Sequence, residues 1–340
     1  MECAFDNLSS NCSSHDLVVD GLLGLAVGDA FGVPVEFMSR AEVRNVNLQE
    51  MEGNDTAPGF WSTWTDEIPQ GAWSDDTSMT IAAMSSIIRN QGELDYDDIM
   101  KQFLAWWYEG KYTSLDYPFG LGKTVSHALM RYRNGTPALD CGGKRIRDNG
   151  NGALMRIFPF SIYCIYKRYD DENTLQIIRN GAGLTHGHDI TTMSCFLYTL
   201  FLRECIRTKK PVEAFGFVFS SIRTALYRNI FSDDAIRAHE HFYIKDFFTN
   251  YDPDKIPEES GYVVDSLTIA IYSVLHTKNY EDAVKMAVNF GYDTDTNAAI
   301  TGSIAGAMYG KKQIPERWLN VLKKKDVLIC IGEQFAKSIK

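Results

Sequence analysis

The chain has 340 residues, of which 45% are hydrophobic, 12% aromatic and 23% charged. This composition excludes global disorder, and a chain of this length buries about three-quarters of the surface that its unfolded form exposes, so it needs no disulfide bonds to stabilise its core. The formal net charge is −10, from 34 basic and 44 acidic residues, which disfavours nucleic acid as a partner.

Apolar residues recur at spacings of three and four along most of the chain, which is the period of an amphipathic helix. In chain order, the pattern predicts helices over 17–30, from near Trp73 to Ile87, around 100–107, and over 122–133, 153–166, 189–207, 212–228, 267–274, 281–290, 295–309 and 326–338. Few runs alternate with period two, and no strand–helix–strand rhythm is present. We therefore predict an all-α fold.

Three long connections separate these predicted helices, over 39–72, 134–152 and 229–261. They are rich in Gly, Asn, Asp and Pro, and loops of this length in a compact protein are often functional. No flexible linker divides the chain, and no repeat of 20–50 residues is present. We expect an N-terminal tail over 1–15 and a single domain over 16–340.

The seven cysteines form no Cys-x-x-Cys pair and their number is odd, which favours a reducing, intracellular environment. No Lys or Arg precedes Arg40, so the positively charged start of a signal peptide is missing. The apolar stretch 17–34 contains Asp20 and Asp29, which argues against a membrane span. We predict a cytoplasmic protein without a membrane partner, with Lys323–Lys325 as a solvated turn.

Two acidic clusters stand at predicted helix starts, Trp73-Ser74-Asp75-Asp76-Thr77 and Asp293-Thr294-Asp295-Thr296. Ser, Thr and Asp at a helix start also cap free N–H groups, so one such cluster alone would be explained by capping. Two clusters with paired carboxylates fit that explanation less well, because adjacent carboxylates repel unless a cation lies between them. Hard oxygen ligands select Mg²⁺, Mn²⁺ or Ca²⁺ over zinc.

Two stretches resemble a calcium loop and a P-loop, but neither matches its motif. The stretch from Asp293 lacks the Gly and the Glu of a calcium loop, since Ala298 and Ile304 occupy those positions. The Gly120-Leu121-Gly122-Lys123-Thr124 stretch would need a glycine at Tyr117 to be a P-loop. The Asn149-Gly150-Asn151-Gly152 turn is either a backbone cradle for an oxyanion or phosphate, or a simple helix entry.

Histidines occur in two groups. His186-Gly187-His188-Asp189 is either a substrate contact, a metal site of the His-Asp phosphohydrolase kind, or a polar helix entry. His239-Glu240-His241 lies in a charged segment, and we expect it to be solvated. Gly302 and Gly306 match a membrane dimerisation motif, but in a soluble chain they favour close packing of two helices.

Several of these motifs, in this order, resemble the ADP-ribosylglycohydrolase family, which includes the dinitrogenase-reductase-activating glycohydrolases. The resemblance extends over roughly 16–322 and rests on Gly24-x-x-x-Gly28-Asp29-Ala30, Pro34-Val35-Glu36-Phe37, Trp73–Thr77, Asn151–Arg156, Leu184-Thr185-His186, Gly261–Asp265, Asp293–Gly302 and Ile314–Trp318. The two acidic motifs together are specific, whereas each glycine turn alone is not.

The resemblance implies an orthogonal all-α bundle with a binuclear site for two Mg²⁺ or Mn²⁺ ions. It implies that the metal ligands are Ser74, Asp75, Asp76, Asp293, Asp295 and Thr296, and that Glu36 lies beside them on a mobile loop. It also implies that ADP-ribose is bound by Gly120, Gly122, Asn149, Gly150, Asn151, Gly152, Met155, His186 and Tyr262. The catalytic residues would then be Glu36, Asp75, Asp76 and Asp295.

The chain departs from the family pattern at two positions. Tyr292 stands where the family usually has Gly, and Asn297 where it usually has an aliphatic residue; a bulky Tyr292 would reshape the pocket. The expected activity is metal-dependent cleavage of the glycosidic bond between ADP-ribose and an acceptor, through an oxocarbenium-like state.

The resemblance also bears on the linkage that is cleaved and on the acceptor. The motifs favour ADP-ribosyl-arginine on a protein, and serine or a small molecule are the other acceptors. The alternatives are an inactive ADP-ribose-binding or crystallin-like protein, and a His-Asp-type phosphohydrolase.

Overall fold

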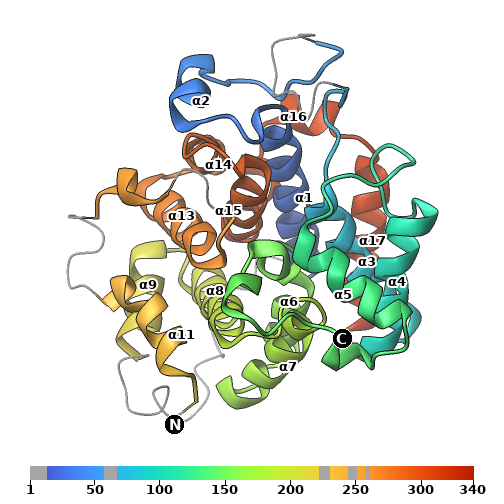
Figure 1. The fold of residues 1–340 in the computed structure, drawn as a ribbon. Coiled ribbons are helices and arrows are strands. Elements are labelled where there is room, and N and C mark those ends of the chain that lie inside the picture. Colours follow the sequence, from blue (N-terminus) through green and yellow to red (C-terminus); the bar gives the residue numbers. More distant parts are fainter. Residues whose placement is uncertain (1–13, 57–66, 222–229, 244–250, 258–260) are drawn as a thin grey trace.

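The computed structural model describes residues 14–56, 67–221, 230–243, 251–257 and 261–340. Within these ranges the regular structure is helical, and the β pairing is limited to two isolated bridges, Gly143 with His186 and Gly150 with Tyr262. Figure 1 shows the helices packed around one another without a sheet in the described part of the chain. The predicted all-α class is confirmed.

Most of the predicted helices are present, with bounds that differ by a few residues. The α-helices are Ser14–Gly32 (α1), Arg40–Val46 (α2), Asp75–Arg89 (α3), Tyr96–Glu109 (α4), Lys123–Arg133 (α5), Phe158–Tyr166 (α6), Asp171–Gly183 (α7), Asp189–Thr208 (α8), Pro211–Ser221 (α9), Asp233–Ala238 (α11), Val263–His276 (α13), Tyr280–Val288 (α14), Thr294–Tyr309 (α15), Glu316–Val321 (α16) and Lys325–Ser338 (α17). Short 3₁₀ turns join them, among them Val33–Val35 (η1), Ile146–Asp148 (η3) and Asn151–Arg156 (η4). Residues 222–228 of the helix predicted over 212–228, most of the expected N-terminal tail, and Cys3 and Cys12 lie outside the described residues.

Helices α1 and α15 form the centre of the fold, and they run side by side in opposite directions (Figure 1). Their backbones meet, because a Cβ atom on Gly24 would overlap the carbonyl oxygen of Gly302, and one on Gly28 would overlap that of Ala298. The Tyr280 hydroxyl donates to the Gly24 carbonyl at 2.6 Å. The glycines of α15 therefore serve close helix packing, as predicted, and the partner helix is α1.

The remaining helices surround this pair. Helices α3 and α17 pack against α1, α13 and α8 pack against α15, and α14 contacts both. One continuous cluster of buried apolar side chains runs through these helices. Because α1 and α15 are antiparallel, the C-terminal end of α1 lies beside the N-terminal end of α15, and the Thr294 hydroxyl donates to the Gly32 carbonyl at 2.8 Å.

The helix predicted over 153–166 is divided in two. Residues 151–156 form the 3₁₀ turn η4, and α6 begins at Phe158 with Pro159 in its first turn. Proline has no N–H and its ring clashes with the preceding turn, so it is tolerated at the start of a helix but not in its interior. The division is thus a local effect of Pro159 that the apolar pattern does not show.

Several short helices lie where loops or nothing were predicted. Helix α2 lies in the connection 39–72 and begins with a capping box, in which Ser39 and Glu42 bond each other's backbone amides at 2.8 and 3.3 Å. Helix α11 lies in the connection 229–261, and the apolar pattern predicts neither α7 nor α16, whereas α9 is the start of the helix predicted over 212–228. Helices of six or seven residues are too short to show a periodic apolar face, so capping is the stronger local indication.

The prediction that His239 and His241 are solvated is wrong. His239 is fully buried, with Ser194 Oγ at 2.8 Å from Nε2 and the Ala235 carbonyl at 2.8 Å from Nδ1. His241 packs its ring on Phe242 and contacts the Thr268 hydroxyl at 2.8 Å. The charged neighbours in the sequence face outward on the short helical turns, while the imidazoles face α8 and α13.

Three further features noted in the sequence can be located in the structure. Lys323 and Lys324 form a turn, as predicted, and the Lys324 ammonium donates to the Thr113 carbonyl at 2.8 Å. Residues Leu17–Val35 are long and apolar enough to cross a membrane, but the whole segment is buried inside the protein. The described cysteines are unpaired, and four of them are buried: Cys141, Cys164, Cys195 and Cys205.

Candidate metal centre and binding pocket

The acidic centre begins with a residue that the sequence motifs did not assign to the site. Asp29 lies on α1 and is fully buried. Its Oδ1 accepts from the Ser74 amide at 2.9 Å, and its Oδ2 accepts from the amide and the hydroxyl of Thr77 at 3.0 and 2.6 Å. Asp29 therefore caps the N-terminus of α3 from another helix and fixes where the first acidic cluster lies.

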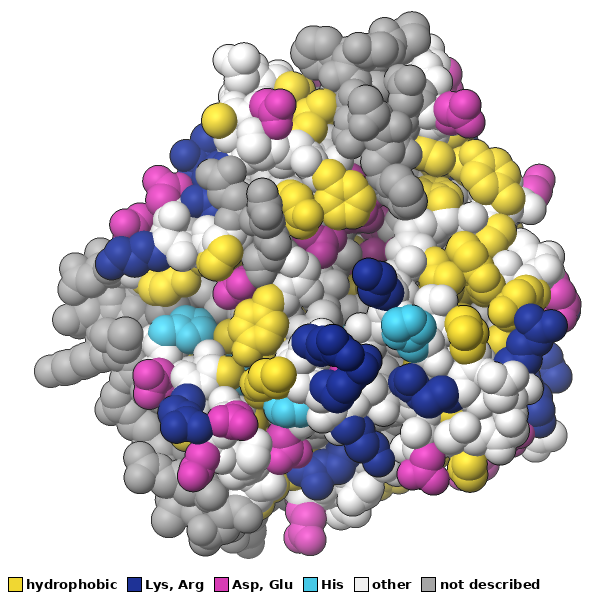
Figure 2. Space-filling model, in the orientation of Figure 1, with side chains coloured by type: hydrophobic (Ala, Val, Ile, Leu, Met, Phe, Trp, Pro, Cys, Tyr) yellow, Lys and Arg dark blue, Asp and Glu magenta, His cyan; other side chains and the backbone are white. Residues whose placement is uncertain are grey.

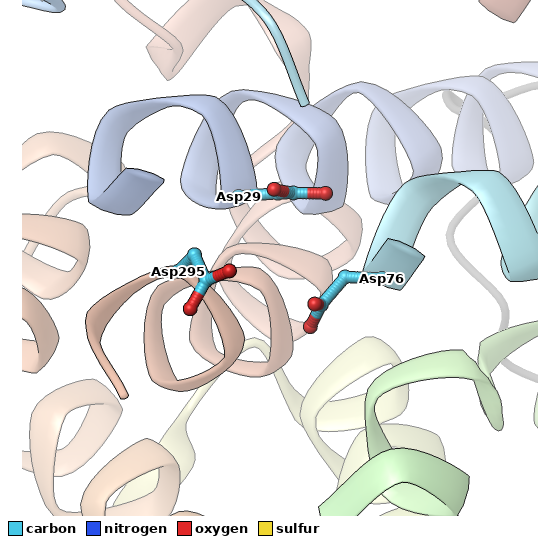
Figure 3. A group of neighbouring side chains, drawn as sticks. All are labelled: Asp29, Asp76 and Asp295. Carbon is cyan, nitrogen blue, oxygen red and sulfur yellow. The ribbon is translucent and has the colours of Figure 1, made fainter. Parts of the chain in front are cut away.

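Three carboxylates from three helices converge at this point. Figure 3 shows Asp29 of α1, Asp76 of α3 and Asp295 of α15 facing a common space. One oxygen atom of each lies within 4.8 Å of the others. The Thr296 hydroxyl donates to Asp76 Oδ2 at 3.3 Å, and Ser74 Oγ donates to the same oxygen at 3.1 Å.

A second group of carboxylates shares one member with the first. Glu36, Asp293 and Asp295 also bring one oxygen each within 4.8 Å of one another. Asn151 Nδ2 donates to Asp293 Oδ2 at 2.7 Å and holds that side chain in place. Asp295 therefore belongs to both groups, which is the arrangement expected when two cations are held side by side.

The donor set fits hard divalent cations. Asp76 Oδ1 and Asp295 Oδ1 are buried and have no hydrogen-bond partner among the described residues. None of the ion pairs of the described part of the chain involves Glu36, Asp75, Asp76, Asp293 or Asp295. Buried carboxylates without counter-charges are costly, and a bound cation removes that cost.

The same environment changes the acidity of the centre. Burial raises the pKa of Asp29 to about 6. Burial and then the charge of Asp295 raise the pKa of Glu36, and burial and then Asp76 raise that of Asp295. The pKa values of Asp75 and Asp76 rise through burial and then through Asp29. Without a cation this centre therefore takes up protons.

A pocket of about 240 Å³ opens onto these carboxylates. Figure 2 shows acidic side chains inside the hollow near the middle of this face, and Lys and Arg side chains along its border. The pocket is lined by Glu36, Phe37, Asp75, Gly120, Gly122, Lys123, Thr124, Val125, Gly150, Asn151, Gly152, Met155, His186, Gly261, Asp293, Asp295 and Thr296. It therefore combines a cation-binding wall with positively charged and neutral donor groups.

The two glycine turns form part of the pocket wall. Gly120 lies against Asp75, and a Cβ atom on Gly120 would overlap Asp75 Oδ1. Gly150 and Gly152 lie beside the His186 ring, whose Nε2 would be 3.6 Å from a Cβ atom on either glycine. A side chain at these positions would occupy space that the pocket leaves to a ligand.

Four of the sequence-predicted residues do not line the pocket. Ser74 and Asp76 are buried directly behind it, in contact with Thr296 and Asp29. The Asn149 side chain is turned away, since its Oδ1 accepts from the amide and hydroxyl of Thr191 and its Nδ2 donates to the Ile146 carbonyl. Tyr262 supports the glycine turn through its bridge to Gly150.

Sequence reasoning missed Lys123, Thr124 and Val125 as site residues, and it named Asp29, Phe37 and Gly261 only within motifs. The sequence does offer an indication for Asp29. A single carboxylate within an apolar helix is buried at a cost in free energy, which suggests that it has a function. Lys123 and Thr124 begin α5 directly after Gly122, the last residue of the first glycine turn. Their position beside the acidic helices is a long-range result of packing.

Tyr292 does not block the pocket. Its φ angle of 60° is a left-handed conformation that glycine adopts more easily, which explains why glycine is usual there in the family that the motifs resemble. The Tyr292 amide donates to the Met38 carbonyl at 2.7 Å, and its carbonyl accepts from the Phe37 amide. Tyr292 thus holds the segment that carries Glu36.

The residues of the phosphohydrolase alternative do not form a metal site. His188 caps α8, with Nδ1 accepting from the Ile190 amide at 3.2 Å. Asp189 accepts from the Ser232 amide at 3.1 Å and lies 3.8 Å from Arg179. Neither residue belongs to the acidic groups or to the pocket.

Comparison with known proteins agrees with the geometry. The family model for ADP-ribosylglycohydrolase matches residues 11–340. The chain is 30% identical over 324 residues to "ADP-ribosylarginine hydrolase Tri1" of Serratia proteamaculans, covering 94% of this chain and 79% of that protein. It is 29% identical over 316 residues to "ADP-ribosyl-[dinitrogen reductase] glycohydrolase" of Rhodospirillum rubrum, covering 92% of each. A solved structure titled "ADP-ribosylglycohydrolase-related protein complex" is similar with a TM-score of 0.74 at 26% identity, over 96% of this chain and 99% of that one.

Proposed function

The chain belongs to the ADP-ribosylglycohydrolase family and is an ADP-ribosyl glycohydrolase, and on this basis we propose that it releases ADP-ribose from arginine side chains of proteins with two divalent cations bound at the acidic centre. The observation that supports this most strongly is the pair of carboxylate groups that share Asp295 at the wall of a ligand pocket. The inactive, crystallin-like alternative has no support from this centre, since both acidic clusters are complete.

Asp29, Asp76 and Asp295 would hold one cation, and Glu36, Asp293 and Asp295 the other, with the Asp75, Ser74 and Thr296 oxygens available beside them. When bound, such a pair supplies Lewis acidity for ribose hydroxyls and lowers the pKa of a water molecule. All of these ligands are oxygen atoms, which favours Mg²⁺ or Mn²⁺. We propose Mg²⁺ as the physiological ion.

The residues that line the pocket have two further roles, diphosphate binding and proton transfer. His186, Lys123 and the Gly150–Gly152 turn face the part of the pocket that is suited to a diphosphate, because they offer donors there. Glu36 lies at the acidic wall, next to Phe37 on the pocket border. Cleavage of the C–N bond of a cationic ADP-ribosyl-guanidinium releases a neutral guanidine, so no acid is required at the leaving group. Glu36 is then the group that takes a proton from the attacking water.

The proposal of an arginine linkage rests on the names of the relatives and on the charge of the protein. The two relatives described above are named for ADP-ribosylarginine and for an ADP-ribosylated reductase. A cationic acceptor also suits a carboxylate-rich pocket in a chain with a net charge of −10.

The test is to incubate the enzyme with ADP-ribosyl-arginine and ADP-ribosyl-serine peptides, with Mg²⁺ or with EDTA, and to measure free ADP-ribose. We expect release from the arginine peptide in Mg²⁺ only. Faster release from the serine peptide would contradict the linkage but retain the activity, and full activity in EDTA would contradict the metal centre.

We further propose that the protein works in the cytoplasm. The free thiols, four of them buried, support a reducing compartment. The test is to fractionate cells, to detect the protein in each fraction with an antibody, and to compare its distribution with those of cytoplasmic and membrane markers.

A further inference from the structure

Arg156 is a buried cation without an acidic partner among the described residues. It is fully buried at the end of η4, and its guanidinium lies 4.9 Å from the centre of the Phe103 ring. Its Nη1 donates to the Gly181 carbonyl at 3.1 Å and its Nη2 donates to the Thr185 hydroxyl oxygen at 2.7 Å. Burial lowers its pKa to about 10, so it is still charged at neutral pH. A buried charge of this kind is expensive and calls for a role.

The Thr185 hydroxyl connects this charge to the pocket. Thr185 is fully buried, and its Oγ1 lies 2.8 Å from His186 Nδ1. A hydroxyl has one hydrogen and two lone pairs, and Arg156 already donates to one lone pair. The only acceptor that the described residues offer to the Thr185 hydrogen is His186 Nδ1. Thr185 therefore donates to Nδ1, which carries no hydrogen.

This assignment fixes the other ring nitrogen. A neutral imidazole with a bare Nδ1 carries its hydrogen on Nε2. Nε2 lies on the side of the ring that faces Gly150 and Gly152, at the pocket wall. Burial, and then the charge of Arg156, lower the pKa of His186 to about 3, so the ring stays neutral across the physiological range.

We propose that Arg156 and Thr185 are positioning residues that hold His186 as the neutral tautomer with its hydrogen on Nε2, so that His186 donates a hydrogen bond to a ligand oxygen in the pocket. The opposite tautomer would present a lone pair to that oxygen and repel it. A neighbouring cation that draws electrons from the Thr185 oxygen makes the hydroxyl a stronger donor, which stabilises the arrangement further.

The ligand oxygen belongs to the diphosphate or to a ribose of ADP-ribose, and this identification rests on the proposed function. A phosphate oxygen carries charge, so its bond to Nε2–H is of the stronger, charge-assisted kind. The tautomer itself does not rest on that function, because it follows from the contacts of the ligand-free protein.

The test compares Thr185→Val, which removes the hydroxyl and keeps the shape, with Thr185→Ser, which keeps the hydroxyl. Nitrogen NMR of the full-length protein labelled at histidine distinguishes a bare ring nitrogen from a protonated one, and His186→Gln identifies the His186 signals among those of the seven histidines. In the wild type and in Thr185→Ser we expect a bare Nδ1 and a protonated Nε2. In Thr185→Val we expect the two tautomers to be mixed.

Calorimetry with free ADP-ribose gives the functional readout. We expect Thr185→Val to weaken binding by the factor by which the Nε2–H tautomer is depopulated, about twofold for an even mixture and more where the other tautomer prevails, and Thr185→Ser to bind as the wild type does. A merely structural role for Thr185 would lower the melting temperature of Thr185→Val without changing the ring-nitrogen signals.

An unchanged tautomer in Thr185→Val, or unchanged ADP-ribose affinity, would overturn the proposal. Arg156→Met provides a second variant with the same expected shift of tautomer, and the Thr185 pair decides the matter if Arg156→Met does not fold. Failure of the wild type to bind ADP-ribose would overturn the proposed function instead, while the NMR signals of the ligand-free protein would still decide the tautomer.

Discussion

Phe37 and Tyr292 hold the Glu36 segment against the start of α15. Their ring centres are 5.2 Å apart in an edge-on arrangement, and the Phe37 amide donates to the Tyr292 carbonyl. The acidic residue at the pocket border is therefore attached to the same backbone that carries Asp293 and Asp295. Tyr292 adopts the left-handed φ of 60° to make this contact.

Replacement of Tyr292 separates the contribution of the ring from that of the backbone. Both Tyr292→Ala and Tyr292→Gly lose the contact with Phe37. Only glycine removes the strain of the left-handed conformation, which costs about 1 kcal/mol in other residues. We expect Tyr292→Gly to be more stable than Tyr292→Ala by about 1 kcal/mol in urea unfolding. Equal stability would mean that the backbone relaxes in the alanine variant.

Replacement of Asp295, which both carboxylate groups share, or of Asp75 should abolish activity and stabilise the metal-free protein. Asp295→Asn and Asp75→Asn should abolish turnover, since each removes a charge from the proposed metal centre. The metal-free variants should melt higher than metal-free wild type, because the burial that raises these pKa values destabilises the ionised form. Glu333→Gln, on the exposed face of α17, is the control and should change neither quantity. Near wild-type turnover in Asp295→Asn would refute the binuclear centre.

Cation binding should stabilise the protein more at pH 8 than at pH 6. The carboxylates have folded pKa values above their unfolded ones, Asp29 at about 6. Their contribution to the stability of the metal-free protein is therefore present at low pH and lost as the pH rises through about 6. A cation takes the place of the protons, and its affinity rises as they leave. Thermal melts with Mg²⁺ and with EDTA at both pH values measure this, and a larger Mg²⁺ shift at pH 6 would contradict it.

His239 should contribute to acid unfolding. Burial lowers its pKa from 6.5 to about 4, so between these values the unfolded chain binds a proton that the folded protein does not. Stability therefore falls as the pH drops through this window. His239→Gln removes this titration. Between pH 7 and pH 4 the variant should lose about 3 kcal/mol less of its free energy of unfolding than the wild type loses. If the free energies of unfolding of the variant and the wild type change in parallel between pH 7 and pH 4, His239 does not titrate in this range.

The space around each glycine predicts opposite effects for a substitution at the α1–α15 contact and one on the exposed face of α9. Gly28→Ala places a Cβ atom into the Ala298 carbonyl and should lower the melting temperature strongly. Gly216→Ala lies on α9 with no atom within 4 Å of its new Cβ, so it should stabilise by up to about 1 kcal/mol through helix propensity. Scanning calorimetry of both variants tests the pair, and a tolerated Gly28→Ala would show that the helices separate easily.

The long helices could be predicted from the sequence because their apolar faces are repeated over several turns. Helix α3 is an example, with Met79, Ala83 and Ile87 on one buried face. Helix α2 could not be found in this way, since it has a single turn of buried apolar contact, at Val43. The division at Pro159 and the burial of His239 are local exceptions that depend on a ring without an N–H and on the orientation of a short turn.

The acidic centre could be predicted in part. Asp75 and Asp76 are adjacent, Asp293 and Asp295 are separated by one residue, and both pairs stand at helix starts, so this local pattern is visible in the sequence. The role of Asp29 depends on the antiparallel approach of α1 and α15, which no local pattern contains. The connection from Arg156 through Thr185 to His186 likewise depends on atoms that meet only in the fold.

The pairing of α1 with α15 also sets the order in which this enzyme can mature during translation. Helix α1 leaves the ribosome long before α15, the partner that covers its glycine face. Until then Leu17–Val35 is an uncovered apolar segment, of the kind that chaperones bind and that promotes aggregation. The nascent chain can assemble its carboxylate groups only after Asp295 has emerged, so metal loading has to follow the synthesis of α15.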